Sequence, residues 1–318
     1  MSLRSAIEAW NRFFFEPQSP LPVSLFRIFY GIVVIVNLLL LHGDWLAWYG
    51  THAWVSLSTM RQLEPGPRLT LFSIIPQKDQ WIGMFFWVFL GLAVFLMAGF
   101  LTRFSTAAVF LCLTSIHQRN LYITHSGDTF LRIAGFFLIF APAGAALSLD
   151  RLIGRRRGKE TEEIQPRSPW AQRLIQLQLA LVYLMSFWWK SMGAVWVNGT
   201  ALYYVIHLDE LRRFPLPHWI EHPVILKLGT WLTLALEFSL GVLIWFKELR
   251  YPLLLLGLLF HLCLEYSFNV PMFQWDILSA YILFVDPADI ARARQFTVSL
   301  VRSWLRSPSE TCTPNDPR

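Results

Sequence analysis

Apolar stretches of membrane-spanning length recur along this chain, and they constrain its fold more than any other feature of the sequence. A helix needs about 20 consecutive apolar residues to cross a bilayer core. The stretches that meet or approach this length are 22–42, 80–101, 104–119, 127–148, 173–190, 223–246, 251–268 and 272–287. We expect the two short ones, the third and the eighth, to be tilted or partly interfacial. The predicted fold class is all-α, a polytopic transmembrane helical bundle of about eight spans.

The composition agrees with a membrane protein. Hydrophobic residues make up 55% of the chain and charged residues only 15%, whereas soluble domains average roughly 25% charged residues. The formal net charge of +6 would suit a nucleic-acid partner, but the basic residues lie in loops, where they act as topology signals. We therefore predict membrane lipid as a partner and no nucleic acid.

The distribution of basic residues predicts the orientation of the chain. The run after the fourth span, expected in the cytoplasm, contains Arg151, Arg155, Arg156, Arg157 and Lys159. Counting spans outward from this run places both termini in the cytoplasm. The basic residues that then also fall inside are Arg103, Lys247, Arg250, Arg292 and Arg294. The predicted location is a bacterial-type inner (plasma) membrane, with the active face outward, periplasmic or extracytoplasmic.

The domain organisation follows from these spans. Residues 1–21 form an N-terminal cytoplasmic or interfacial segment, and 22–290 form one transmembrane domain with a polar cytoplasmic connection at 149–170, expected to be flexible. Residues 291–318 form a cytoplasmic tail, expected to be disordered from about 307. The first span is full length and no cleavage site follows it, so no cleavable signal peptide is predicted. The three cysteines form no close pair, so no disulfide framework is predicted.

Lys190, at the end of the fifth span, is the most informative single residue. An ammonium ion is costly at membrane depth, so an intramembrane lysine is a functional candidate. Desolvation favours the neutral amine, which can act as a base near physiological pH. The alternative is a lysine that extends to the membrane interface beside tryptophans. The helix alone leaves both interpretations open.

Further ionisable residues are expected inside the bundle, where they need partners. Two pairs share a helix face at i, i+4 spacing: Asp128 with Arg132, and His261 with Glu265. Other charged residues within spans are Arg27, Glu237 and Asp276. The residues that the topology places in the outer half of the membrane are Lys190, His125, Asp128 and Glu265. This bias favours a pocket that opens outward, and a structural polar network that fixes helix packing is the alternative.

The two outward loops, 43–79 and 191–222, combine aromatic residues with prolines. They could form interfacial helices that cover a membrane-embedded pocket, or simply an aromatic belt at the bilayer surface. No His-x-His or His-Glu-x-x-His spacing occurs, so no metal site is predicted.

Several stretches occur together in a recognisable order: Arg119-Asn120, His125-Ser-Gly-Asp128, 140–150, 178–201 around Lys190, Phe260-His261, 272–275 and 283–287. In these stretches the chain resembles the HTTM domain family, the membrane region shared with vitamin K-dependent gamma-carboxylases. The resemblance covers roughly residues 20–290. Where the carboxylases have two adjacent lysines, this chain has Trp189-Lys190, and Ser126 stands where many HTTM relatives have glycine.

The resemblance implies a particular chemistry. The carboxylases deprotonate a reduced naphthoquinone with a lysine and add oxygen. The resulting alkoxide takes a proton from a glutamate side chain, and the carbanion then adds carbon dioxide. Lys190 matches the base, and His125 matches a histidine that assists at the oxyanion. The supporting residues would be Asp128, Arg132, His261, Glu265, Arg119, Asn120 and Trp196. The implied cofactor is reduced vitamin K or menaquinone, and the implied substrate is a glutamate-containing protein or peptide.

Three other functions remain open at the level of the sequence. A non-enzymatic quinone- or lipid-binding protein would use the same pocket without chemistry. A transporter would need a charged path across the whole bilayer, and no internal repeat of the kind found in many transporters is apparent. A purely structural assembly subunit would tolerate replacement of Lys190 by methionine.

Overall fold

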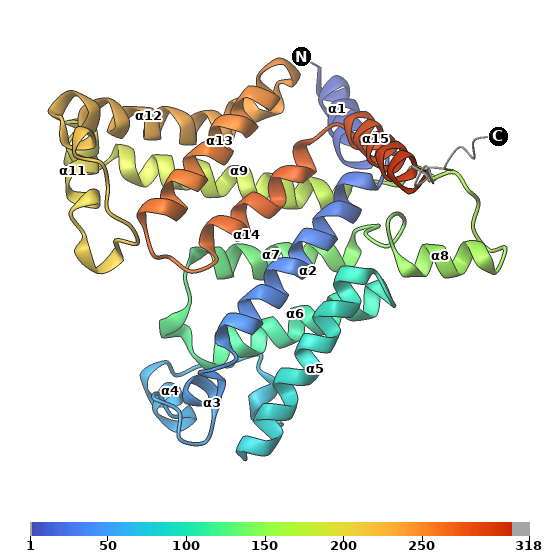
Figure 1. Cartoon of the computed structure of the whole chain (residues 1–318), viewed down its shortest axis with the longest axis horizontal. Helices are drawn as coiled ribbons and strands as arrows, with labels where there is room; N and C mark the ends of the chain where they lie inside the picture. The colour runs from blue at the N-terminus through green and yellow to red at the C-terminus, as the bar shows by residue number, and fades with distance from the viewer. Residues whose placement is uncertain (1, 307–318) are drawn as a thin grey trace, which may run out of the picture.

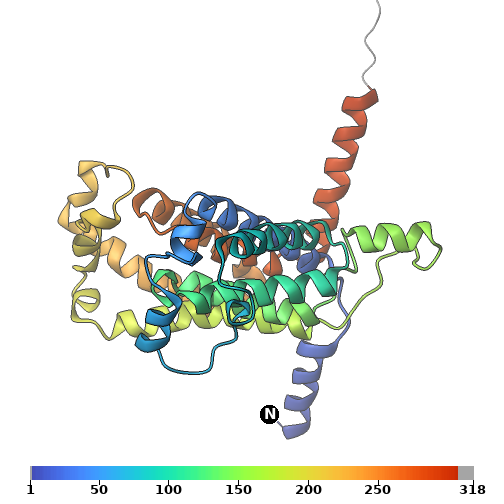
Figure 2. The same ribbon diagram turned by 90° about the horizontal axis from the view of Figure 1, so that it is seen from below.

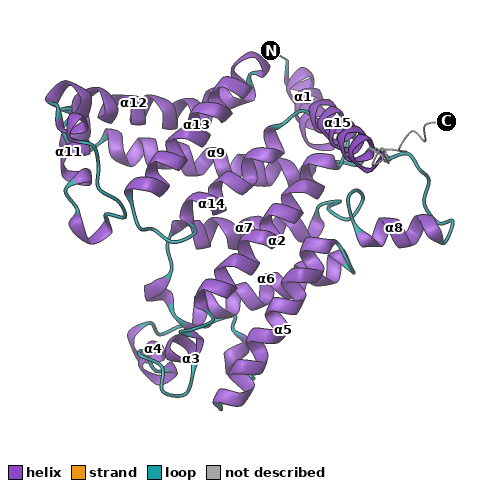
Figure 3. Ribbon diagram, viewed as in Figure 1, coloured by secondary structure: helices purple, strands orange, loops and turns teal. Residues whose placement is uncertain are grey.

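The computed structural model describes residues 2–306, and helices dominate this part of the chain (Figure 3). No strand occurs among these residues, only the isolated bridges Gln18–Arg167 and Arg212–Phe268. The expected all-α class is therefore confirmed, and the segment from 307 onward, expected to be disordered, lies outside the described residues.

The long helices are α1 (Leu3–Phe15), α2 (Leu21–Leu41), α5 (Asp79–Ala98), α6 (Thr102–Arg119), α7 (Ser126–Phe140), α9 (Trp170–Ser191), α12 (Pro223–Val242), α13 (Lys247–Ser267) and α15 (Pro287–Arg306). Shorter α-helices are α3 (Trp45–Tyr49), α4 (Leu57–Leu63), α8 (Leu149–Arg156), α10 (Ala194–Val197), α11 (Ala201–Ile206) and α14 (Phe273–Ser279). Single turns of 3-10 helix are η1 (Leu71–Ser73), η2 (Leu121–Ile123), η3 (Asp209–Leu211), η4 (His218–Glu221), η5 (Leu243–Trp245) and η6 (Ala280–Phe284).

Within residues 2–306, four helices are long and apolar enough to cross a membrane: α2, α5, α12 with its continuation η5, and α13. The other predicted spans are also helical, but two differ from the expected ranges. In the predicted span 127–148 the helix ends at Phe140. Pro142 disfavours helical backbone at the preceding residue, and Ala141 is extended. The range 272–287 divides into α14 and η6.

The short helices of the two aromatic loops lie at one end of the bundle, and the helices on the surface lie at the opposite end. Figures 1 and 2 show α3, α4 and α11 at one end, and α1, α8 and α15 at the other. Helices α1 and α15 run crosswise to the bundle helices in both views. The face of α1 exposes Leu3, Ile7 and Trp10, as expected for a helix that lies on a bilayer surface. The two aromatic loops therefore share one end, as the sequence analysis predicts.

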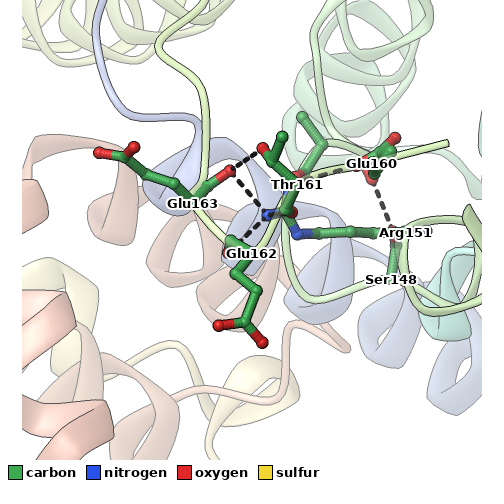
Figure 4. A network of polar contacts seen from close by, with 8 residues as sticks. Ser148, Arg151, Glu160, Thr161, Glu162 and Glu163 are labelled. Carbon is green, nitrogen blue, oxygen red and sulfur yellow. Dashed lines mark hydrogen bonds and ion pairs between the residues drawn. The ribbon is translucent and has the colours of Figure 1, made fainter. Parts of the chain in front are cut away.

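Arg151 organises the connection between α7 and α9 (Figure 4). Its guanidinium donates to the backbone carbonyls of Thr161, Glu162 and Glu163, each at 3.0 Å. The same group lies 3.3 Å from Oε2 of Glu160. Ser148 caps α8 by accepting a hydrogen bond from the backbone N–H of Arg151 at 3.0 Å. The connection is thus folded around one arginine, whereas the sequence predicted a flexible linker.

Arg27 joins α2 to the ends of two other helices. Its side chain is fully buried and donates to the carbonyls of Leu147 at 2.5 Å and Ala143 at 3.1 Å, just beyond the end of α7. A weaker contact reaches the carbonyl of Met97, in the last turn of α5, at 3.5 Å. Backbone carbonyls in the segment between α7 and α8 therefore provide the hydrogen-bond acceptors that a buried guanidinium requires.

Replacing Arg27 with methionine should destabilise the bundle, because methionine fills the space but leaves these carbonyls without a donor. Each orphaned buried acceptor costs roughly 1–3 kcal/mol. We expect a lower melting temperature in detergent than for the control Arg103→Met, since Arg103 is exposed. Equal melting temperatures for the two variants would contradict this role of Arg27.

Candidate functional site

A cavity of about 410 Å³ lies between α9, α12, α13 and α14. This volume is within the range of small-molecule sites, roughly 300–1,000 Å³. Most of the lining is apolar, with residues such as Val182, Phe260 and Ile277. The polar residues that line it are His125, Ser126, Tyr183, Ser186, Lys190, Thr230, Thr233, Glu237, His261 and Gln274. The structure therefore brings four of the predicted site residues to one cavity: Lys190, His125, His261 and Trp196.

Lys190 forms an ion pair with Glu237 across the α9–α12 contact. Its ammonium also lies 5.0 Å from the centre of the Trp196 ring, a cation–π distance. Oε1 of Glu237 additionally accepts a hydrogen bond from Ser186 at 3.0 Å. The Lys190 side chain is 28% exposed and that of Glu237 only 5%, so the lysine is the accessible member of the pair.

His261 belongs to a hydrogen-bonded chain at the deep side of the cavity. Nδ1 of His261 lies 2.5 Å from Oε1 of Gln274, an acceptor, so Nδ1 carries the proton. Nε2 then accepts from the hydroxyl of Tyr183 at 2.6 Å. Tyr183 in turn accepts from the hydroxyl of Tyr281, also at 2.6 Å. All four residues are buried, so the chain fixes both the tautomer and the orientation of His261.

His125 is the N-cap residue of α7, and three contacts hold it. Its Nδ1 accepts from the backbone N–H of Gly127 at 3.0 Å, and its own N–H donates to Oδ2 of Asp128 at 2.8 Å. Because Nδ1 is an acceptor, Nε2 carries the proton and donates to the carbonyl of Pro271 at 2.9 Å. His125 therefore presents an N–H donor at the edge of the cavity.

The expected pairs on α7 and α13 are not formed. Asp128 reaches back to the start of α7 to cap His125, so it faces Nε2 of His117 at 3.4 Å and not Arg132. Within the described residues Arg132 makes no ion pair. Glu265 pairs with Arg213 of the loop before α12, which draws it away from His261.

Arg119 and Asn120 lie at the end of α6, outside the cavity. Arg119 donates to the carbonyl of Val55 at 3.0 Å and so ties the first aromatic loop to the bundle. Asn120 caps η2 by accepting from the N–H of Tyr122 at 3.2 Å. Their contacts are structural, although the sequence resemblance implies a supporting role for both.

Sequence reasoning did not select several residues that the cavity contains. Glu237 was expected as a packing residue as readily as a functional one, and Tyr183, Ser186 and Gln274 were not selected. A signal for two of them exists in the sequence. Tyr183, Ser186 and Lys190 are spaced by three and four residues, which places them on one face of α9.

The cavity and the apolar helices define an integral membrane protein whose polar groups converge inside a helical bundle. A family model for the HTTM domain matches residues 15–288. The chain belongs to the HTTM domain family, which is linked to vitamin K-dependent carboxylases. The resemblance seen in the sequence is thereby confirmed. No curated protein and no solved structure matches the chain.

The Lys190–Glu237 pair predicts unequal effects of removing either partner. Lys190→Met leaves an enclosed carboxylate without its cation, whereas Glu237→Gln leaves an ammonium with partial access to solvent. Breaking a buried pair costs roughly 3–5 kcal/mol. We expect the larger loss of melting temperature for Lys190→Met, and a smaller loss for the double variant than the sum of the two single losses. Additive losses in a thermal double-mutant cycle would show that the pair is not coupled.

Proposed function

We propose that this protein is a quinol-dependent enzyme of the carboxylase type, with the 410 Å³ cavity as its active site. The observation that carries the proposal is the Lys190–Glu237 pair, held under Trp196 in a largely apolar cavity. A partly buried amine with a buried carboxylate partner is a proton-transfer unit, and a bilayer cavity is accessible to a lipid-soluble quinol. In this proposal the chain crosses the membrane about eight times, and the end that carries α1, α8 and α15 is cytoplasmic.

The ion pair can generate a base without creating net charge. Transfer of a proton from the Lys190 ammonium to Glu237 leaves a neutral amine and a neutral acid, both tolerated in a medium of low dielectric. The amine then takes the proton of a quinol hydroxyl. The products are an ammonium and a quinolate, which again form a neutral pair. Glu237 is therefore the residue that makes Lys190 a usable base inside the membrane.

The lining of the cavity suits an aromatic headgroup. Phe260, Phe268 and Phe273 contribute ring faces or edges, and Trp196 closes the side next to Lys190. Aromatic rings favour offset-stacked or edge-to-face contacts with another ring. Reduced vitamin K or menaquinone is the cofactor that the family resemblance implies, and its aromatic ring would fit this lining with its apolar tail directed to lipid. Exclusion of water would protect a strongly basic intermediate.

His125 is the proposed donor to developing negative charge. When bound, a reduced naphthoquinone would supply, with oxygen, a base strong enough to remove a proton from a glutamate side chain of a protein or peptide. The carbanion then adds carbon dioxide. The Nε2–H of His125 is directed to the carbonyl of Pro271, and redirection of this N–H to an oxyanion would stabilise it. The outward end of the bundle is the side from which such a substrate would enter.

Epoxide formation tests the quinol half of the reaction. Purified protein in detergent, supplied with a reduced naphthoquinone, oxygen and bicarbonate, should produce quinone epoxide. Lys190→Met should lower the rate by at least about 100-fold, the lower bound of a typical general-base contribution. The matched control is Lys227→Met, because Lys227 also stacks on a tryptophan, Trp231, but lies outside the cavity.

The outcomes of this assay distinguish an enzyme from a protein that only binds quinol. Epoxide formation that survives in Lys227→Met and is lost in Lys190→Met supports the proposal. Quinol binding without epoxide in the folded wild type would instead indicate a non-enzymatic quinone- or lipid-binding protein, since the apolar lining suits that ligand too.

A further inference from the structure

A second cavity, of about 310 Å³, lies beside the first and shares His125 with it. It is bordered by α2, α6, α7 and the segment before α14. His125 and Asp128 line this cavity, and the buried side chain of Asp276 lies next to them. Their nitrogen and carboxylate oxygen atoms lie within 4.8 Å of one another. We call these three residues the aspartate cluster.

Asp276 is the unusual member of this cluster. It is fully buried on α14, and neither of its carboxylate oxygens has a hydrogen-bond partner among the described residues. Its carboxylate lies against the first turn of α7, where a Cβ on Gly127 would stand 2.5 Å from Oδ2. Glycine at 127 therefore permits the close approach of this carboxylate to Asp128.

Asp276 is the member of the cluster whose charge has no partner in the described residues, whereas Asp128 lies within ion-pair distance of His117 and His125. Asp128 accepts from the N–H of His125 and faces His117 at 3.4 Å, but Asp276 has no donor. No lysine or arginine forms an ion pair with either carboxylate in the part of the chain that the structure describes. Two buried carboxylates at this separation repel each other, and an unpaired buried charge is costly. Such groups are normally paired or bound to a metal ion.

We propose that the carboxylates of Asp128 and Asp276 bind a divalent cation. Carboxylate oxygens are preferred ligands of hard cations such as Mg²⁺, Mn²⁺ and Ca²⁺, and a charge of +2 balances the two carboxylates. The ring of His125 already uses both nitrogens, toward Gly127 and Pro271. Nε2 of His125 can therefore bind the cation only after its hydrogen bond to the carbonyl of Pro271 is broken. The adjoining cavity has room for water ligands, since each water needs about 30 Å³.

A shared proton is the competing explanation for the same pair. A proton on Asp276 removes its charge but adds a hydroxyl group that requires an acceptor. Neither oxygen of Asp276 has a partner in the described residues, so protonation alone leaves the group unsatisfied. The ion site does not depend on the quinol chemistry proposed above, and it is tested by metal binding alone.

Binding of Mn²⁺ is the direct test, because free and bound Mn²⁺ differ in their electron paramagnetic resonance signals. The full chain is purified in detergent, stripped with EDTA and titrated with Mn²⁺. We expect about one bound Mn²⁺ per chain, consistent with one carboxylate cluster, displaced by Mg²⁺ or Ca²⁺. Asp276→Asn keeps the shape of the side chain and should weaken binding by at least about tenfold. Asp44→Asn is the control, because Asp44 is an exposed aspartate outside the cluster.

Two results would overturn the ion site. One is the absence of bound Mn²⁺ in the folded wild type, together with no change of its melting temperature between EDTA and added Mg²⁺, Ca²⁺ or Mn²⁺. That result would show that Asp128 and Asp276 share a proton and do not bind an ion. The other is equal Mn²⁺ affinity in wild type and Asp276→Asn. If Asp276→Asn fails to fold, Asp128→Asn provides the same comparison, since an amide oxygen can still accept the capping N–H of His125.

Discussion

The interior of a bilayer supplies no water, so each charge inside the bundle must be neutralised by the protein or by a ligand. Three residues show how far the protein itself meets this requirement. The guanidinium of Arg27 is hydrogen-bonded to carbonyls in the last turn of α5 and in the segment between α7 and α8. Lys190 is neutralised by a carboxylate on a neighbouring helix. Asp276 has no partner of either kind in the described part of the chain. The first arrangement supports the fold, whereas the second and third are the sites at which we propose proton transfer and ion binding.

The position of Lys190 depends on how α9 and α12 pack. Glu237 comes from the middle of one apolar helix and Lys190 from the last turn of the other, so their pairing fixes the register between the two helices. The same register places Ser186 on the carboxylate and Trp196 beside the ammonium. A single ion pair thus contributes to packing and also provides the proton-transfer unit of the proposed reaction. For this reason stability alone does not distinguish the two roles, and catalysis has to be measured beside it.

Much of the fold follows from the sequence, because membrane length and apolar composition leave few alternatives to a helix. The limits of the helices were harder to predict where backbone details decide, as at Pro142, which ends α7 eight residues before the predicted limit of 148. The site was predicted in part. Lys190 and His125 stand out as ionisable residues near membrane helices, but Glu237, the partner of Lys190, and Pro271, one partner of His125, come from distant segments. Local i, i+4 spacing suggested Arg132 for Asp128, whereas helix capping turned Asp128 toward His125 and His117.

His125 lines both cavities, so it is common to the two proposed sites. Its Nε2–H borders the cavity of Lys190, while its backbone N–H binds Asp128 of the aspartate cluster. A charge added or removed at the cluster therefore acts on the residue that the proposed reaction uses as a donor. The carbonyl of Pro271, which accepts from Nε2, immediately precedes Met272, whose backbone is left-handed with φ of 61°. This conformation is uncommon for a residue other than glycine. It turns the backbone directly before α14, where neighbouring residues line both cavities.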